Sequence, residues 1–416
     1  MISLSTNLND LICTLLLLFH QSYTCEEDFL FFFKSYFDGL SGIYSLSELI
    51  GRKIQKGCEK LVREQFLWNK DAERKFFENY ITQIEHQIKK YKNQKDTNLE
   101  KLREKLLKKI FYKDEEQNTY YAFWPKTGNV QKGNTVVQGR NSLIGNYTEE
   151  WTKNLLEMVL GDIAKESNYK EPFRVVRNVV CEDLGLSKDS PADIVLTIST
   201  EAKNTDRKTK TKAVELKPEE ILVIFEVKMS IVWNWKYSPN GVLDCIGDFT
   251  KHQGNPGLLR SDTVLKAVGK CIMMRVNNPG KRSVPIVVLG NTPITRNYER
   301  TVDNLKNLGF IQGFYSLNPK PFDAGNEKLS DHYLMESSDE GFITVQNYAV
   351  LKDLITKLIN TSLKDEKIFF SSWKSTDELG KIIKDSCGKI LKDRYTKEDY
   401  RKIAELFLMY VKDGVI

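Results

Sequence analysis

The sequence predicts a mixed α/β fold, in which a central mixed β-sheet is flanked by helices and the two ends of the chain are helical. Two short apolar runs rich in β-branched residues, at 192–198 and 221–228, are typical of buried strands. Segments with helical periodicity alternate with such runs from residue 147 to residue 308. A hydrophobic content of 41% in 416 residues is ample for the cores of two or three domains.

Composition restricts the class of protein. The seven cysteines are widely spaced and never form a CxxC pair, which argues against a disulfide framework and a zinc site and favours a cytoplasmic location. Because the chain has only four histidines, its composition does not favour a histidine-rich metal site or a Ser-His-Asp triad. The apolar run 11–19 is too short to span a bilayer, so we expect a buried helix there and no membrane association. A signal peptide is the alternative, although no Lys or Arg precedes the run.

Residues 1–120 are predicted to form a helical N-terminal region. Helices are expected at 71–90 and 97–111, joined as an αα-hairpin, with no convincing strand before about residue 115. The segment 89–113 holds ten Lys or Arg against three acids, and such a face either contacts a polyanion or, more commonly, is simply solvated. The Gly-rich stretch 120–146 is expected to be a linker or an ordered surface loop.

Residues 121–330 are predicted to form the core and residues 331–416 a helical C-terminal region. The order of expected elements indicates a mixed sheet with helices on both faces. These elements are a helix at 147–165, strands at 173–180, 192–198 and 221–228, a helix at 262–275, a strand at 284–289 and a helix at 296–308. A basic connection, 202–218, joins the second and third strands. Later helices are expected at 348–360, 377–392 and 397–411, for DNA contact or subunit pairing.

Charged residues interrupt two of the expected strands. Asp193 lies in the first, and Glu226 and Lys228 end the second, 33 positions after Asp193. Residues two apart in a strand share a face, so Glu226 and Lys228 project together. Buried charges need a partner, and two carboxylates with the Val227 carbonyl would offer Mg²⁺ the hard oxygen ligands that it prefers. Such a metal lowers the pKa of its bound water and neutralises charge on a phosphoryl oxygen.

Lys228 would orient or deprotonate the attacking water. Burial lowers the pKa of a lysine and neighbouring carboxylates raise it, so the sequence leaves its role as a general base open. A third acid, Glu149, falls at the margin of the apolar face of the helix 147–165, whereas Glu150 points nearly opposite the centre of that face. Glu149 is therefore the acid expected to reach a core-side site. An acid at a helix N-terminus that interacts with the macrodipole is the alternative interpretation.

These residues resemble the PD-(D/E)XK nuclease superfamily, in particular the type II restriction endonucleases. The matching pattern is a helix with Glu149, then Asp193 in Pro191-Ala192-Asp193, then Glu226-Val227-Lys228 in an apolar strand, followed by a helix and a strand. It covers about residues 140–310. The resemblance implies a restriction-endonuclease-like core, Mg²⁺ binding by Asp193 and Glu226, a role for Lys228 with the water nucleophile, and support of the metal site by Glu149.

Two other Glu-x-Lys copies show why the three letters alone decide nothing. Glu73-Arg74-Lys75 and Glu215-Leu216-Lys217 also occur, but only Glu226-Val227-Lys228 ends an apolar strand with an acidic strand upstream. Ala192 departs from the family pattern, in which proline and aspartate are often adjacent; the chemistry needs the carboxylate rather than the proline. The alternative for Asp193 and Glu226 is an ordinary surface ion pair with Lys228.

The sequence therefore predicts a Mg²⁺-dependent type II restriction endonuclease that cuts double-stranded DNA at a specific sequence, as a homodimer because two cuts are needed on a near-symmetric duplex. A structure-specific repair or recombination nuclease and a catalytically inactive DNA-binding protein with this fold are the alternatives. Trp233 and Trp235 are a possible contact surface, with core packing of at least one favoured. Arg260 and Lys266, at the start of the helix expected at 262–275, are candidate phosphate contacts, with helix capping and solvation as the alternative. The candidates for base readout, chosen by position, are Lys236, Asn240, Lys251, His252 and Gln253.

Overall fold

The computed structural model of the chain describes residues 66–91, 98–126, 137–166, 173–202, 206–207, 210–211, 213–277, 284–326, 331–364, 396, 398–399 and 401–403. The chain divides into two compact units, residues 1–63 and 64–416, and all described residues belong to the second. The helix expected at 11–19 lies outside the described residues, as does the one at 377–392 and most of the one at 397–411.

A seven-stranded mixed sheet forms the centre of the second unit, which confirms the predicted α/β class with a central mixed sheet. Its strand order is β15-β13-β11-β8-β4-β3-β7. Antiparallel pairing joins β3 to β4 and β4 to β8, whereas β8, β11, β13 and β15 run parallel. The strands span β3 Arg174–Val180, β4 Ala192–Thr197, β7 Val214–Glu215, β8 Ile221–Val227, β11 Ile286–Gly290, β13 Gly313–Ser316 and β15 Phe342–Thr344. All seven residues of β8 are buried, as expected for a strand covered on both faces.

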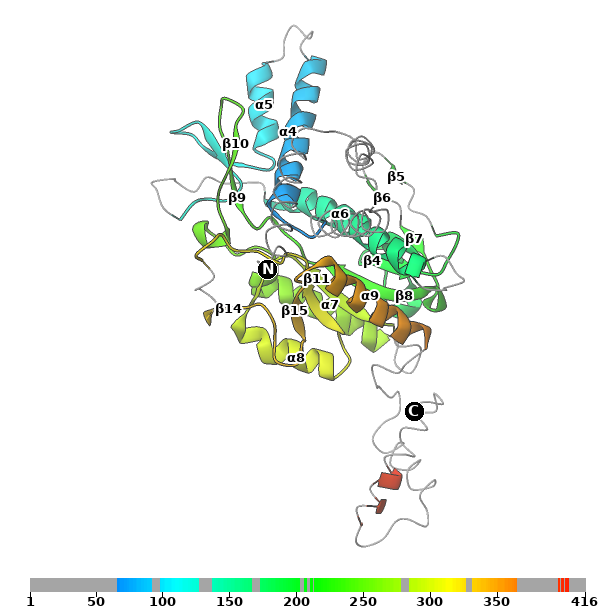
Figure 1. Ribbon diagram of the computed structural model, residues 1–416. Coiled ribbons are helices and arrows are strands. Elements are labelled where there is room, and N and C mark those ends of the chain that lie inside the picture. Colours follow the sequence, from blue (N-terminus) through cyan, green and yellow to red (C-terminus); the bar gives the residue numbers. More distant parts are fainter. Residues whose placement is uncertain are drawn as a thin grey trace, which may run out of the picture. The chain divides into compact units, whose positions relative to one another are not determined.

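Helices cover both faces of this sheet (Figure 1). On one face α6 (Val137–Glu166) and α9 (Tyr348–Leu363) pack together over β3, β4 and β8. On the other face α7 (Ser261–Asn277) buries residues at helical spacing, Val264, Ala267, Cys271 and Met274, in one core with Ile224, Val288 and residues of α8 (Glu299–Asn307). Among the described residues, no helix combines the length and apolar character that a bilayer crossing requires.

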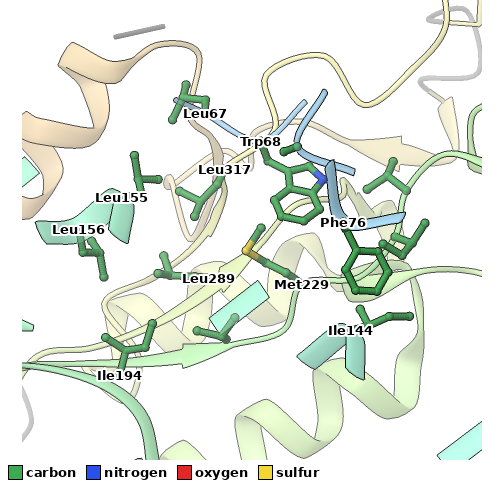
Figure 2. Close-up of a cluster of buried hydrophobic side chains, with 14 of the residues drawn as sticks. Leu67, Trp68, Phe76, Ile144, Leu155, Leu156, Ile194, Met229, Leu289 and Leu317 are labelled. Carbon is green, nitrogen blue, oxygen red and sulfur yellow. The ribbon is translucent and has the colours of Figure 1, made fainter. Parts of the chain in front are cut away.

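A helical hairpin and a second sheet contribute side chains to the large hydrophobic core that also contains residues of α6 and α9. The expected pair of helices is present as α4 (Lys70–Tyr91) and α5 (Leu99–Leu107), which pack on each other. An antiparallel sheet of order β1-β2-β9-β10 lies beside them, formed by Tyr112–Asp114, Thr119–Tyr121, Asn234–Tyr237 and Leu243–Gly247. Trp68, just before α4, and Met229, just after β8, both belong to the large core that includes Leu289 and Leu317 (Figure 2).

The other elements of the described residues are short. Two-stranded sheets pair β5 (Asp206–Arg207) with β6 (Lys210–Thr211) and β12 (Ile294–Thr295) with β14 (Tyr333–Leu334). The 3₁₀ turns are Glu182–Leu184, Pro218–Glu220, Phe249–Lys251, Gly257–Leu259 and Arg296–Tyr298. β5, β6 and β7 all fall within the basic connection 202–218.

The structure corrects three expectations about the organisation of the chain. Strands β1 and β2 interrupt the predicted helical region 1–120, because Asp114 accepts hydrogen bonds from the N–H groups of Glu116 and Gln117 and so closes a tight turn. Strands β14 and β15 lie in the predicted helical region 331–416 and are too short to show an alternating pattern. Helix α6 begins at Val137 rather than at about 147, within the predicted linker.

Candidate active site

The pairing of β4 with β8 brings the two predicted carboxylates together. Ile194 pairs with Phe225, so Asp193 and Glu226 are the next residues at this end of the antiparallel pair. Asp193 Oδ2 accepts a hydrogen bond of 2.8 Å from the backbone N–H of Val227. Glu226 is almost completely buried, at 2% exposure, on the sheet face covered by α7.

Lys228 directly follows β8 and forms ion pairs with both carboxylates. Its Nζ lies 2.5 Å from Glu226 Oε1 and 3.6 Å from Asp193 Oδ2, and it donates a 3.2 Å hydrogen bond to the carbonyl oxygen of Val227. The structure thus brings the three predicted residues Asp193, Glu226 and Lys228 into direct contact. They form a buried cluster with limited access to solvent rather than an exposed surface ion pair.

A second lysine, Lys270 on α7, also forms ion pairs with both carboxylates, through their other oxygen atoms. Its Nζ lies 3.2 Å from Asp193 Oδ1 and 2.5 Å from Glu226 Oε2. Sequence reasoning missed this residue, because one more lysine in an amphipathic helix carries little information. A weak signal was present, since Ala267, Cys271 and Met274 place Lys270 at the margin of the buried face of α7 rather than on its exposed side.

The pKa values of the two carboxylates shift in opposite directions. Burial alone would raise the pKa of Asp193, but the positive charges of Lys228 and Lys270 and the Val227 N–H outweigh it and lower that pKa. Burial and the negative charge of Asp193 raise the pKa of Glu226. Burial opposes the charged form of each lysine, yet the two carboxylates raise the pKa of both Lys228 and Lys270.

Glu149 is close to this cluster but is held by an arginine. Arg177 of β3 lies 2.7 Å from Glu149 Oε2 through one terminal nitrogen and 2.7 Å from Glu150 Oε2 through the other. Glu150, which helix phase placed away from the core, is therefore bound to the same guanidinium. Burial and the charge of Asp193 raise the pKa of Glu149. Its contribution to a metal site stays a prediction.

The oxygen atoms of the cluster suit a hard divalent cation. Asp193, Glu226 and the Val227 carbonyl supply oxygen donors, and Glu226 Oε2 is a buried atom without a hydrogen-bond donor, although the Lys270 ammonium is near it. Within the described ranges, no group of three or more His, Cys, Asp and Glu side chains gathers around a common point. Two carboxylates with retained water fit Mg²⁺, which commonly binds through one or two carboxylates.

Three of the four predicted DNA contacts lie on separate elements, and Arg260 lies just before α7. Arg260 makes two hydrogen bonds, of 2.9 and 3.0 Å, to Asp262 at the start of α7, and Lys266 lies 3.7 Å from the same carboxylate. Lys236 is half-buried on β9, and Lys251 is exposed at the end of a 3₁₀ turn. Arg260 and Lys266 thus belong to the helix that carries Lys270 or to its N-terminal approach.

Three other candidate contacts are buried in the fold, which confirms the favoured core packing of the tryptophans and corrects the role predicted for His252. Trp233 and Trp235 are both core residues. His252 is fully buried and stacks on Phe123 with ring centroids 3.9 Å apart, and burial lowers its pKa to about 4. Gln253 donates its side-chain N–H to the carbonyl of Pro125. The two tryptophans and His252 are therefore not available to read a base edge in this conformation, whereas Gln253 is half-buried.

Glu73, from a discounted Glu-x-Lys copy, holds the segment after β8. It is fully buried on α4, and each carboxylate oxygen accepts two N–H bonds of 2.6–3.1 Å. The donors are the backbone N–H groups of Val232 and Trp233 and the indole N–H groups of Trp68 and Trp235. Burial raises its pKa to about 7. A helix remote in sequence thereby fixes the chain that leaves the candidate site.

The candidate site is thus a buried cluster of two carboxylates and two lysines at one end of the β4–β8 pair. Three of the four predicted catalytic residues meet in it, the fourth is held beside it, and Lys270 is added by the structure. Comparisons of the chain with protein-family models, curated proteins and solved structures gave no match.

Proposed function

We propose that this chain is a Mg²⁺-dependent endonuclease that hydrolyses phosphodiester bonds in double-stranded DNA at a specific sequence, as a homodimer that cuts both strands. The observation that carries the proposal is the contact among Asp193, Glu226 and Lys228 at one end of an antiparallel strand pair. Apart from the short strands of the basic connection and from β9 and β10, which lie between β8 and α7, the element order is α6-β3-β4-β8-α7-β11. This order agrees with the PD-(D/E)XK resemblance.

Asp193 and Glu226 would hold the metal, with the Val227 carbonyl as a third oxygen donor. When bound, Mg²⁺ supplies a more acidic water and a positive charge against the phosphoryl oxygen. The Val227 N–H keeps Asp193 in place, and the buried wall of β8 excludes bulk water behind Glu226. The paired strands β4 and β8 therefore hold the oxygen atoms of Asp193, Glu226 and Val227 close together.

Lys228 is placed to act as a hydrogen-bond donor in this chemistry. Two carboxylates hold it in the ammonium form, which has three N–H donors and no lone pair to accept a proton. It would orient the attacking water and stabilise charge that develops on the phosphate. Glu149, which forms an ion pair with Arg177, would add negative charge beside the metal site on the side of α6. The contacts proposed for the DNA backbone are Lys236, Lys251, Arg260 and Lys266.

The decisive experiment is digestion of unmethylated phage DNA and supercoiled plasmid by the full chain with Mg²⁺, followed by sequencing of the fragment ends. We expect discrete double-strand cuts at one recurring sequence. Asp193→Asn and Glu226→Gln should each lower the cleavage rate by at least about 100-fold, because each removes a carboxylate that would hold the metal ion, whose positive charge stabilises the transition state. Glu215→Gln is the matched control, since Glu215 belongs to an exposed Glu-x-Lys copy.

The products distinguish this proposal from its rivals. Cleavage of junctions or a smear without a common sequence would replace it with a structure-specific nuclease. Nicked circles that never become linear would contradict the two-cut homodimer. A folded protein that binds DNA but cuts none of these substrates with Mg²⁺ or Mn²⁺ would be a nuclease-like binding protein. Circular dichroism of each variant keeps a loss of activity separate from a loss of structure.

A further inference from the structure

The two carboxylates of the candidate site are saturated by lysines. Each carboxylate directs one oxygen toward Lys228 and the other toward Lys270: Oδ2 and Oδ1 of Asp193, Oε1 and Oε2 of Glu226. Two negative and two positive charges then sum to zero. A divalent cation added to this set without any movement would give a compact site of net charge +2, which like-charge repulsion opposes.

The two lysines differ in how they are held. Lys228 extends the strand that carries Glu226, and its ammonium also donates to the Val227 carbonyl. Lys270 comes from α7, on the facing layer, and the contacts of its ammonium are with the two carboxylates. The backbone of α7 is fixed by the buried residues Ala267 and Cys271 on either side of Lys270. The side chain of Lys270 can therefore swing away without moving its helix.

We propose that Lys270 is an internal counter-ion that occupies the cation position between Asp193 and Glu226, and that a divalent metal enters by displacing it. This inference rests on the metal site in the proposed function. The Lys270 ammonium supplies the positive charge that the buried Glu226 requires when no metal is bound. Its side chain is about one-fifth exposed, so a path to solvent exists for the displaced ammonium.

Competition between Lys270 and the metal predicts a gain in metal affinity when the lysine charge is removed. Lys270→Met keeps the unbranched side chain and removes the ammonium. Titration of the DNA-free protein with Mn²⁺ by calorimetry, at fixed pH and ionic strength, should give a dissociation constant about tenfold or more below that of the wild type. Lys270→Arg retains the charge and should bind Mn²⁺ as weakly as the wild type.

Lys306→Met is the matched control. Lys306 also lies on a helix of this sheet face and forms an ion pair with a glutamate, Glu340, but its helix is α8. Its loss should leave the Mn²⁺ dissociation constant unchanged. If Lys270→Met binds Mn²⁺ no more tightly than the wild type while keeping the native circular dichroism spectrum, the counter-ion role is wrong.

Thermal unfolding provides a second readout that does not depend on activity. In EDTA, Lys270→Met should melt below the wild type because Asp193 and Glu226 repel each other, and the gain in Tm on adding Mn²⁺ should exceed that of the wild type. Lys270→Gln, which keeps one N–H donor for the pair, serves if the methionine variant does not fold. An equal Tm gain in wild type and in the folded variant would also overturn the inference.

The outcomes separate this inference from the proposed function. Tighter Mn²⁺ binding by Lys270→Met in a protein that cuts no DNA would uphold the counter-ion and reject the nuclease. Site-specific cleavage by a wild type whose Mn²⁺ affinity does not respond to Lys270→Met would uphold the nuclease and reject the counter-ion. If no variant binds Mn²⁺ at millimolar concentration, both fail.

Discussion

At the scale of single residues, Asp193 and Glu226 share the same two lysines and yet hold protons differently. Asp193 keeps a backbone N–H donor and is about one-fifth exposed, whereas Glu226 is 2% exposed and faces the charge of Asp193. The pKa of the aspartate therefore falls and that of the glutamate rises. A proton taken up by the pair is held on Glu226, so acid should weaken the cluster through this residue first.

Glu73 predicts an unusual dependence of stability on pH. Its pKa is about 7 in the folded protein against an ordinary 4.5, because burial disfavours the carboxylate. Between these two pH values the folded chain holds a proton that the unfolded chain has released. Its contribution is therefore fully present below pH 4.5 and is lost as pH rises to 7. The shift of 7 − 4.5 = 2.5 units corresponds to roughly 3 kcal/mol.

Urea unfolding of the wild type and Glu73→Gln at pH 5 and at pH 7.5 measures this effect. The amide of the variant cannot titrate, and it points N–H groups at donors, so the variant should be less stable at both pH values. The stability gap between the two proteins should narrow from pH 5 to pH 7.5 by roughly 2 kcal/mol. A gap that stays constant would show that Glu73 is already ionised at pH 5.

The residues that sequence reasoning located and those that it missed differ in their surroundings. Asp193, Glu226 and Lys228 stood out because a charge inside an apolar, β-branched run is rare. Lys270 and Glu73 lie on amphipathic helices, where charged residues are common and only tertiary packing decides which are buried. The buried role of His252 was equally hidden, because its stacking partner Phe123 lies on a distant segment.

At the scale of elements, tertiary contacts override local propensity most clearly in α6. Its first turns contain Gly139 and Gly145, which made a loop the natural expectation. Arg140 lies in these turns, is buried, and donates hydrogen bonds to the carbonyls of Ile110 and Ala122. Those contacts hold the first turns of α6 against the residues that flank the strand pair β1–β2. The strands β4, β8 and β11 and the helix α7 were predictable because each is apolar over its whole length or along one regular face, and β3 because four of its seven residues are valine.

The early start of α6 makes Gly145→Ala a stabilising change. An added Cβ would meet no neighbouring atom within 4 Å, and alanine favours a helix interior over glycine. We expect the free energy of unfolding to rise by about 0.5–1 kcal/mol, measured by urea denaturation. If the helix began only after residue 146, the substitution would give no such gain.

Gly185→Ala provides the opposite result as a control. Gly185 has φ of +70°, and its added Cβ would lie 2.1 Å from the side-chain nitrogen of Asn277. The same chemical change should therefore lower the free energy of unfolding, by roughly 1–3 kcal/mol. Together the two variants separate helix propensity from a general effect of replacing glycine.

At the scale of the whole molecule, the helical ends are less separate from the core than the sequence indicated. Helix α4 supplies Glu73 to the segment after β8, and α9 packs directly on β8. Both belong to one hydrophobic cluster with residues of the central sheet. Boundaries near residues 120 and 330 therefore do not mark independent folding units, because the amphipathic faces of these helices have their partners in the core.

Two shortened chains test this integration. A chain that starts at residue 64 keeps the partners of α4 within the described residues, and we expect one cooperative thermal transition. A chain that starts at residue 98 lacks Trp68 and Glu73 and leaves the backbone N–H of Val232 and the indole of Trp235 buried without an acceptor. It should lose near-ultraviolet circular dichroism and the sharp transition. Equal melting of the two chains would show that the N-terminal hairpin is dispensable.

The register of β4 against β8 has a consequence for how this protein can change over evolutionary time. The meeting of Asp193 and Glu226 depends on the pairing of Ile194 with Phe225, not on the number of residues between the strands. Deleting one residue inside either strand would turn its side chains to the opposite face and dismantle the cluster. The basic connection 202–218 can lengthen or shorten at little cost. Homologous chains should therefore differ freely in the interval between these acids while keeping each acid in phase with its own strand.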